Sequence, residues 1–212
     1  SSAASDVYKR QVHLDKVKAE QFVLPIGKKK THVIGINPSQ ITTEDLAVSL
    51  QPAANYVPTD GYSKVAAVER HHNTGKIGVA VAKGYGIRNG AVASSVSHDS
   101  HNIIVIGDND RDMALAVDEI IRTQGGYTVV ENGEVFETLP LPIMGLMSDA
   151  GFESVNETLG RMIKKAHEMG VPADIEPFIT LSFLALPVIP ALRITPRGLC
   201  LLTAKGPEIL QE

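Results

Sequence analysis

Two groups of histidines are the residues of this chain best suited to chemistry. His71 and His72 are adjacent, and His98, Asp99 and His101 lie within four residues, so the two groups hold four of the seven histidines. Imidazole and carboxylate groups at such close spacing can bind a metal ion or transfer protons. Their nitrogen and oxygen atoms would suit zinc, manganese or iron. We therefore take these five residues as a candidate auxiliary metal site, and His98, Asp99 and His101 as candidate catalytic residues.

The local backbone decides whether these side chains can meet. In an extended segment, Asp99 and His101 point to the opposite face from His98. They converge only if the segment breaks into a turn, which its Ser, His and Asp composition favours. His71 and His72 would also point apart on a strand, so we expect at most one of them to join the site. The alternative is a buried polar network that anchors loops, with Asp99 accepting a hydrogen bond from an imidazole.

Other polar motifs nearby carry weaker signals. Glu69 and Arg70 are expected to form surface ion pairs, with each other or with neighbours, that contribute little to stability. Residues 83–86 have neither the Walker spacing nor the dinucleotide-binding pattern, so phosphate binding is not expected. The serines at 94–95 lack the GxSxG pattern of a nucleophile elbow. Cys200 has no histidine near it in sequence and is expected to be a small buried residue. None of these outranks the histidine groups.

The bulk composition argues against several classes of partner. Twenty basic and 24 acidic residues give a formal net charge of -4, without the basic excess of proteins that bind nucleic acids or anionic membranes. No apolar run reaches the roughly 18 residues of a transmembrane helix. One cysteine cannot form an internal disulfide, which favours a reducing compartment. We therefore expect a cytoplasmic protein that binds neither nucleic acid nor membranes.

Composition along the chain suggests three parts. Residues 1–11 are small, polar and aperiodic, and we interpret them as a non-native or disordered leader. Residues 12–58 alternate short strand patterns with irregular stretches, and we interpret them as a residual β segment or linker. Residues 59–212 are predicted to form the principal domain, long enough to bury a substantial core.

Hydrophobic patterning predicts mainly short strands. The predicted strands cover residues 21–24, 31–36, 64–70, 77–82, 91–96 and 102–107. Their continuous apolar runs suit strands that are buried on both faces. Residues 41–62 contain prolines and turn signals and are predicted to be irregular. Asn132 and Gly133 predict a hairpin between strands at 127–130 and 135–139.

Two helices are predicted among these strands. The first, capped by Asn109 or Asp110, ends at Gly125. The second begins with the capping-box pattern at Ser154. The apolar, proline-rich tail at 178–202 is predicted to pack as strand and loop. The fold class is therefore α/β or α+β, with a mixed β-sheet and two principal helices.

Longer motifs make the sequence similar to a known family. They are ERHH-x-TG from Glu69, KG-x-G from Lys83, GA-x-ASS-x-x-HDSHN from Gly90, LPLPI-x-GLMS from Leu139 and PF-x-TLSFLALPVIP from Pro177. Together they resemble the C-terminal region of bacterial adenine deaminases, which belong to the amidohydrolase superfamily. The resemblance covers about residues 20 to 205.

The resemblance implies an enzyme that hydrolyses adenine to hypoxanthine and ammonia. In that family, manganese or iron in a (β/α) barrel activates water for attack on the purine. The metals are held by a His-x-His pair and by further His, Glu and Asp ligands. This chain contains no His-x-His pair and is shorter than the roughly 250 residues of a complete barrel. The resemblance thus implies a C-terminal adenine deaminase-type domain without the catalytic TIM barrel, inactive by itself, from an enzyme whose substrate is adenine.

Two other functions remain open from the residues alone. One is a structural or oligomerisation module whose apolar tail mediates association. The other is an independent metal-dependent hydrolase that uses His71, His72, His98, Asp99 and His101. We also expect the intact protein to be a homo-oligomer, in which the missing barrel domain is the partner of this region.

Overall fold

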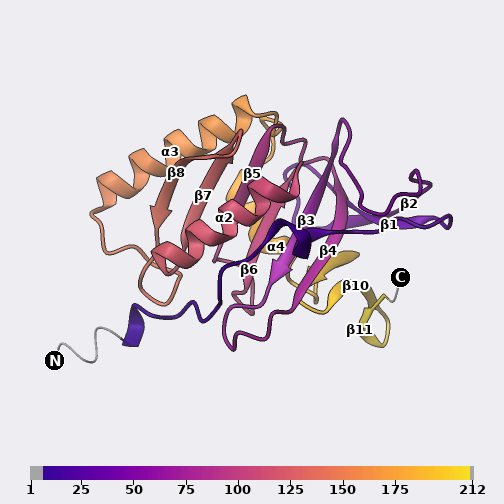
Figure 1. The fold of residues 1–212 in the computed structure, drawn as a ribbon, viewed down its shortest axis with the longest axis horizontal. Helices are drawn as coiled ribbons and strands as arrows, with labels where there is room; N and C mark the ends of the chain where they lie inside the picture. Colours follow the sequence, from indigo (N-terminus) through magenta and orange to yellow (C-terminus); the bar gives the residue numbers. More distant parts are fainter. Residues whose placement is uncertain (1–6, 211–212) are drawn as a thin grey trace.

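The computed structural model describes residues 7–210 and contains two sheets (Figure 1). In spatial order, the large sheet consists of β2 (Thr43–Val48), β1 (Thr31–Ile36), β4 (Ile77–Lys83), β3 (Tyr62–Val68), β6 (Ile103–Gly107), β5 (Gly90–Ser94), β7 (Gly126–Glu131) and β8 (Glu134–Pro140). The small sheet consists of β11 (Gly206–Ile209), β10 (Gly198–Thr203) and β9 (Leu192–Thr195). The strands predicted from residue 31 onwards all form, within a few residues of their expected bounds.

The large sheet is mixed, as predicted. β1 pairs with β4 in parallel, and the other neighbouring strands pair in antiparallel fashion. A (β/α) barrel closes eight parallel strands, each followed by a helix. This sheet is open, with β2 and β8 at its edges. The part of the chain that the structure describes therefore contains no such barrel.

Between residues 19 and 210, four helical elements accompany the sheets. They are the 3-10 helix η1 (Ala19–Phe22) and the α-helices α2 (Asp110–Thr123), α3 (Phe152–Glu168) and α4 (Pro177–Leu184). The two principal helices predicted from the sequence are α2 and α3. Across residues 7–210, none of the helices has both the length and the apolar character needed to span a bilayer.

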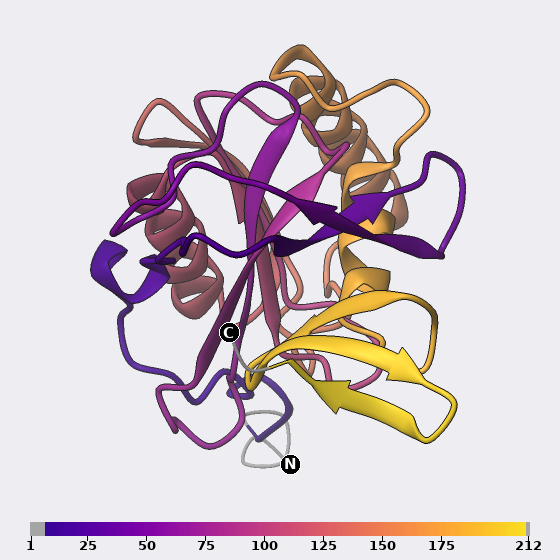
Figure 2. The ribbon, with the colours of Figure 1, turned by 90° about the vertical axis from the view of Figure 1, so that its right-hand side faces the viewer.

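The large sheet is the middle layer of three. Alternate residues of a strand point to opposite faces. Val65 and Ala67 pack in one core cluster with residues of α3 and α4, whereas Ala66 and Val68 pack in another with residues of α2. Figure 2 shows α2 on one side of the sheet and α3 and α4 on the other. Burial on both faces explains why the central strands read as continuous apolar runs.

Local sequence signals explain α2 and the hairpin that follows it. The Asn109 side chain caps α2 by accepting a hydrogen bond from the backbone N–H of Asp112. Gln124 then leaves the helix in the left-handed region, one residue before the predicted glycine stop. Asn132 and Gly133 have φ values of 52° and 81° and form the turn between β7 and β8. Both predictions are confirmed.

The first part of the chain differs from the sequence prediction at two places. Residues 21–24 do not form a strand, because η1 ends there and buries Phe22 in the core beside α2. Residues 41–62 are not wholly irregular, because β2 forms within them. β2 is an edge strand with mostly exposed or half-buried residues, so it lacks the apolar run that identified the others.

The second half differs at two further places. α3 begins at Phe152, two residues before the expected capping box, and its N-cap Gly151 makes no side-chain cap hydrogen bond. The tail predicted as strand and loop begins with α4. There the Glu176 side chain accepts a hydrogen bond from the backbone N–H of Ile179, and Pro177 occupies the first turn. α4 has no amphipathic pattern because most of its own residues are apolar, so periodicity could not reveal it.

The expected domain limits stay predictions. The boundary near residue 59 falls between β2 and β3, which belong to one sheet. Within the expected leader, residues 1–6 lie outside the described residues. Residues 7–11 are described, and the carbonyl of Tyr8 accepts a hydrogen bond of 2.7 Å from the backbone N–H of Met144.

Candidate functional site

The two histidine groups lie in neighbouring loops at one end of the large sheet. Residues 69–76 connect β3 to β4, and residues 95–102 connect β5 to β6. β3 and β6 pair with Val68 opposite Ile103, so the loops that extend from this end lie side by side. The topology therefore brings together groups that are about 30 residues apart in the sequence.

The second group sits on a turn, which was the condition for its side chains to meet. The backbone N–H of His101 donates to the carbonyl of Ser97 over 2.6 Å, and His101 has a φ of 49°. The ring centroids of His98 and His101 are 5.4 Å apart. His98 Nδ1 lies 3.6 Å from Asp99 Oδ1, and its ring stacks on Phe183 of α4 at a centroid distance of 5.1 Å.

One member of the first pair contacts the second loop. His71 Nε2 lies 2.7 Å from the carbonyl oxygen of Ser100. The His72 ring is exposed, and its centroid is 6.3 Å from that of His71. The structure thus places His71, His98, Asp99 and His101 in one neighbourhood and leaves His72 at its margin.

The neighbourhood is not arranged as a metal centre. Within residues 7–210, no group of three or more His, Cys, Asp or Glu side chains is placed to hold a metal ion. His71 Nε2 faces a backbone carbonyl, and His101 Nδ1 accepts a hydrogen bond from the backbone N–H of Ser97. The described residues therefore do not fit a manganese or iron centre as they stand. Metal binding by His71, His72, His98, Asp99 and His101 stays a prediction that would require these side chains to rearrange.

His101 is the histidine whose proton affinity the site changes. Burial lowers the pKa of His101, and the charges of His98 and Arg70 lower it further, whereas the Asp99 carboxylate opposes them. The uncharged ring is consistent with Nδ1 accepting the hydrogen bond from Ser97. His101 is therefore suited to accept hydrogen bonds near neutral pH.

The prediction that Arg70 forms a surface ion pair is wrong. Arg70 is 2% exposed, and its guanidinium donates hydrogen bonds to the backbone carbonyls of Gln11, His101 and Met144. Burial lowers the pKa of Arg70 to about 10. One buried cation thus joins three separate segments of the chain through their carbonyls.

Glu69 has a different local role from the one expected. Its carboxylate accepts hydrogen bonds from the backbone N–H groups of His71, His72 and Thr74, at 2.5, 2.9 and 3.1 Å. Burial opposes ionisation of Glu69, but the hydrogen bonds from this loop outweigh it and lower the pKa of the carboxyl. Glu69 therefore fixes the loop that carries the first histidine pair.

The two serines at 94–95 and Cys200, which were not expected to react, pack within the structure. Ser95 Oγ donates to the carbonyl of Gly145 over 2.6 Å, and Ser94 Oγ donates to the carbonyl of Val96. Cys200 is buried, and burial raises the pKa of its thiol. The hydrogen bonds of the two serines give neither of them a histidine base. Burial keeps the Cys200 thiol protonated near neutral pH.

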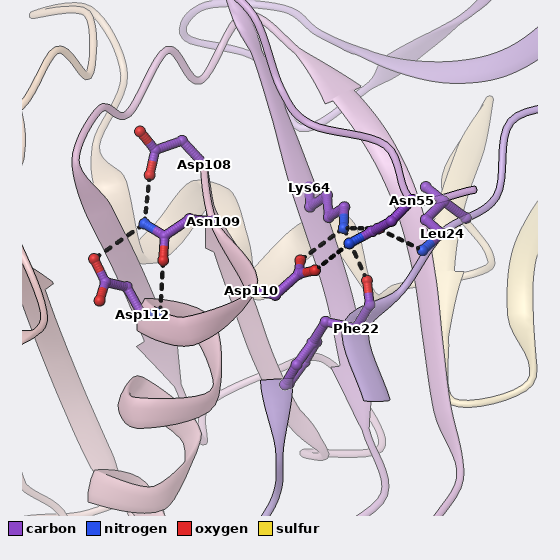
Figure 3. Close-up of polar contacts among 8 residues, drawn as sticks. All are labelled: Phe22, Leu24, Asn55, Lys64, Asp108, Asn109, Asp110 and Asp112. Atoms are coloured by element: carbon purple, nitrogen blue, oxygen red, sulfur yellow. Dashed lines mark hydrogen bonds and ion pairs between the residues drawn. The ribbon is translucent and has the colours of Figure 1, made fainter. Parts of the chain in front are cut away.

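A buried charged network was missed by the sequence prediction (Figure 3). Lys64 Nζ donates to the carbonyl of Phe22 and to the side-chain oxygens of Asn55 and Asp110, at 3.0, 2.6 and 2.6 Å. Burial lowers the pKa of Lys64, and the hydrogen bond and charge of Asp110 oppose this. The signal in the sequence was a lysine inside the apolar strand pattern SKVAAV. Because three partners use all three ammonium protons, Lys64 joins β3, η1 and α2 and is not free to react.

A cavity of about 290 Å³ lies beside the histidine turn. Asp99 and Ser100 form its polar side, and Leu186 and Val188 are among its apolar residues. The cavity adjoins the end of α4, so the turn and the residues after α4 share one exposed corner.

Fold and site together define the class of protein. It is an α/β domain of three layers, in which Glu69 and Arg70 hold loops in place through hydrogen bonds to the backbone. The sequence model of the family described as "Adenine deaminase C-terminal domain" matches residues 40–205. The chain belongs to this family.

Relatives named as adenine deaminases extend the match over most of the chain. A protein of Desulfitobacterium hafniense, "Adenine deaminase", is 50% identical over 197 residues, which are 92% of this chain and 34% of the relative. One of Nitratidesulfovibrio vulgaris with the same name is 51% identical over 181 residues, 84% of this chain and 32% of the relative. "Adenine deaminase 2" of Carboxydothermus hydrogenoformans is 41% identical over 191 residues, 89% of this chain and 34% of the relative. The chain thus spans about a third of the length of the curated relatives it matches.

Proposed function

We propose that this chain is the C-terminal part of an enzyme that hydrolyses adenine to hypoxanthine and ammonia. The reaction adds water at C6 of the purine and releases the amino group as ammonia. The observation that carries the proposal is identity of about 50% with proteins named adenine deaminase, over 84–92% of this chain. The matched stretch of this extent includes loops as well as strands and helices.

We also propose that the catalytic centre lies in the part of the parent protein that corresponds to the other two thirds of these relatives. Manganese or iron would be bound there and would make water nucleophilic at neutral pH. The described residues support this division, because none of their acidic and histidine groups is arranged to hold such a metal. The isolated chain is then inactive, and its role is to support the catalytic domain.

Independent metal-dependent hydrolysis is the weaker alternative. It needs at least three ligands around an open position, whereas His71 and His101 make hydrogen bonds to the backbone. We propose instead that the histidine loops have a positioning role within the intact enzyme. Homo-oligomerisation and a cytoplasmic location remain further proposals, and light scattering on the intact parent tests the first.

A chimera tests the proposed function. The segment of the Desulfitobacterium hafniense relative that aligns with this chain is replaced by this chain, and adenine-dependent ammonia release is measured with manganese present. We expect the chimera to deaminate adenine, because the replaced segment keeps half of its residues. The relative truncated before this segment is the matched control. A folded, metal-loaded chimera without activity, beside an active intact relative, would contradict the proposal.

A further inference from the structure

An apolar groove opens beside the loop between β8 and α3. It has a volume of about 500 Å³. Its lining comes from the ends of β7 and β8, from the loop and from the start of α3, and includes Leu139, Leu141, Leu146, Met147, Phe152 and Leu159. Met147 and Phe152 are 52% and 79% exposed. Large apolar side chains gathered around a groove are typical of a surface that is covered in the intact protein.

The loop that forms the rim is held in a defined shape. The backbone N–H of Met147 donates to the carbonyl of Ile143, which closes the loop. Gly145 has a φ of 72°, and a Cβ at this position would meet Arg70 Nη1 at 2.7 Å. Ser95 Oγ donates to the Gly145 carbonyl from the neighbouring loop. The groove is therefore a preformed feature rather than a consequence of a loose loop.

The same loop is fastened to the start of the domain. Arg70 donates to the carbonyl of Gln11 over 2.8 Å and to that of Met144 over 3.1 Å. The backbone N–H of His13 donates to the carbonyl of Arg70 over 2.7 Å. The first described segment of the polypeptide therefore lies beside the loop that forms part of the groove. Figure 1 shows this N-terminal segment passing below α2 on the side where the loop between β8 and α3 descends.

We propose that the groove, with Met147 and Phe152 on its rim, is the docking surface for the catalytic domain of the same polypeptide. The inference rests on the proposed function, in which that domain precedes this one. Relatives are about three times as long as the matched segment, so a large partner is available on the same chain. A partner tethered next to the groove has a high effective concentration there. Its contact residues would be apolar side chains that fill the groove.

Hydrogen exchange in the chimera tests this surface. We expect backbone amides of residues 143–159 to exchange about tenfold more slowly, or slower still, in the chimera than in the isolated chain. Residues 31–48, at the opposite edge of the sheet, should exchange equally in both. Unchanged exchange at residues 143–159, or protection confined to residues 31–48, would overturn the proposal. If the chimera does not fold, the aligned positions of the intact relative are compared with this chain instead.

Charged substitutions give a second readout. M147E combined with F152E should return the exchange of residues 143–159 in the chimera to the rate of the isolated chain. V57E is the matched control, because Val57 is 71% exposed and lies on the connection between β2 and β3, outside the lining of the groove. Both variants of the isolated chain should unfold at the wild-type urea concentration, since the altered side chains are exposed. Retained protection in the double variant would overturn the proposal.

Two further outcomes distinguish docking of the catalytic domain from dimerisation and from the proposed function. A second copy of the chain is the rival occupant, and it would appear as dimers of the isolated chain whose residues 143–159 become protected with rising concentration. That result would overturn docking of the catalytic domain. A chimera that deaminates adenine without protection of the groove would contradict the docking surface alone, and protection without activity would contradict the proposed function alone.

Discussion

At the scale of residues, the ERHH motif has its main structural effect through Glu69 and Arg70. The sequence directed attention to the histidines, because imidazole groups at close spacing suggest metal or proton chemistry. The structure places His71 and His101 against backbone atoms, and it places Arg70 among three carbonyls. Sequence could not show this, since the carbonyls belong to residues 11, 101 and 144, which are distant along the chain.

Replacing Arg70 by methionine should destabilise the domain. The variant leaves the carbonyls of Gln11, His101 and Met144 without their donor, at a cost of about 3 kcal/mol. Urea unfolding of the isolated chain measures the loss. R197M is the control, because Arg197 is exposed. Equal unfolding free energies for the two variants would show that the buried guanidinium does not hold these segments.

The lowered pKa of His101 should make stability depend on pH. Because the folded-state pKa lies below the unfolded value near 6.5, the unfolded chain binds more protons as pH falls through this value. The contribution of His101 is present above the unfolded pKa and is lost as pH falls towards the folded one. The loss of unfolding free energy from about pH 7.5 to about pH 5.5 should therefore be smaller in H101N than in wild type.

Asparagine is the replacement chosen for His101 because it tolerates a positive φ. The lowered pKa of Glu69 affects a more acidic range, because its stabilising contribution is present above the ordinary glutamate pKa and is lost as pH falls from there through the lowered pKa. Urea unfolding at several pH values gives the dependence of the unfolding free energy on pH for wild type and for H101N. Identical slopes in wild type and H101N would contradict the account of this histidine.

At the scale of elements, prediction succeeded where a local signal or a continuous apolar run was present. Asn109, Asn132 and Gly133 marked a helix start and a hairpin through their own backbone preferences. β2 and α4 were missed because neither shows a hydrophobic period: β2 is an edge strand, and α4 consists mostly of apolar residues. Their structure is decided by tertiary packing, which a single sequence does not display.

The loop between β8 and α3 gives an element-scale prediction with a matched control of opposite sign. G145A should destabilise by about 1–2 kcal/mol from the left-handed backbone alone, and by more because its Cβ meets Arg70. G160A, at an exposed position in α3 with free space around a Cβ, should stabilise by about 0.5–1 kcal/mol. Thermal unfolding compares the two. Destabilisation by both substitutions, or by neither, would contradict the assigned backbone roles.

At the scale of the whole molecule, sequence predicted the class and the family better than it predicted the site. Burial of the sheet by helices on both faces follows from the apolar runs and from the amphipathic patterns of α2 and α3. The site required contacts between loops that no local pattern contains. The groove beside the β8–α3 loop is likewise a product of assembly, since its walls come from β7, β8 and α3.

The central claim is that these residues support a catalytic domain and hold no catalytic centre of their own. The most direct test is to incubate the purified chain with adenine and manganese, or iron, and to measure ammonia. We predict no release above a protein-free blank. Sustained ammonia production by the chain, abolished in H98A and H101A, would contradict the claim, because it would place the activated water among the histidines described here.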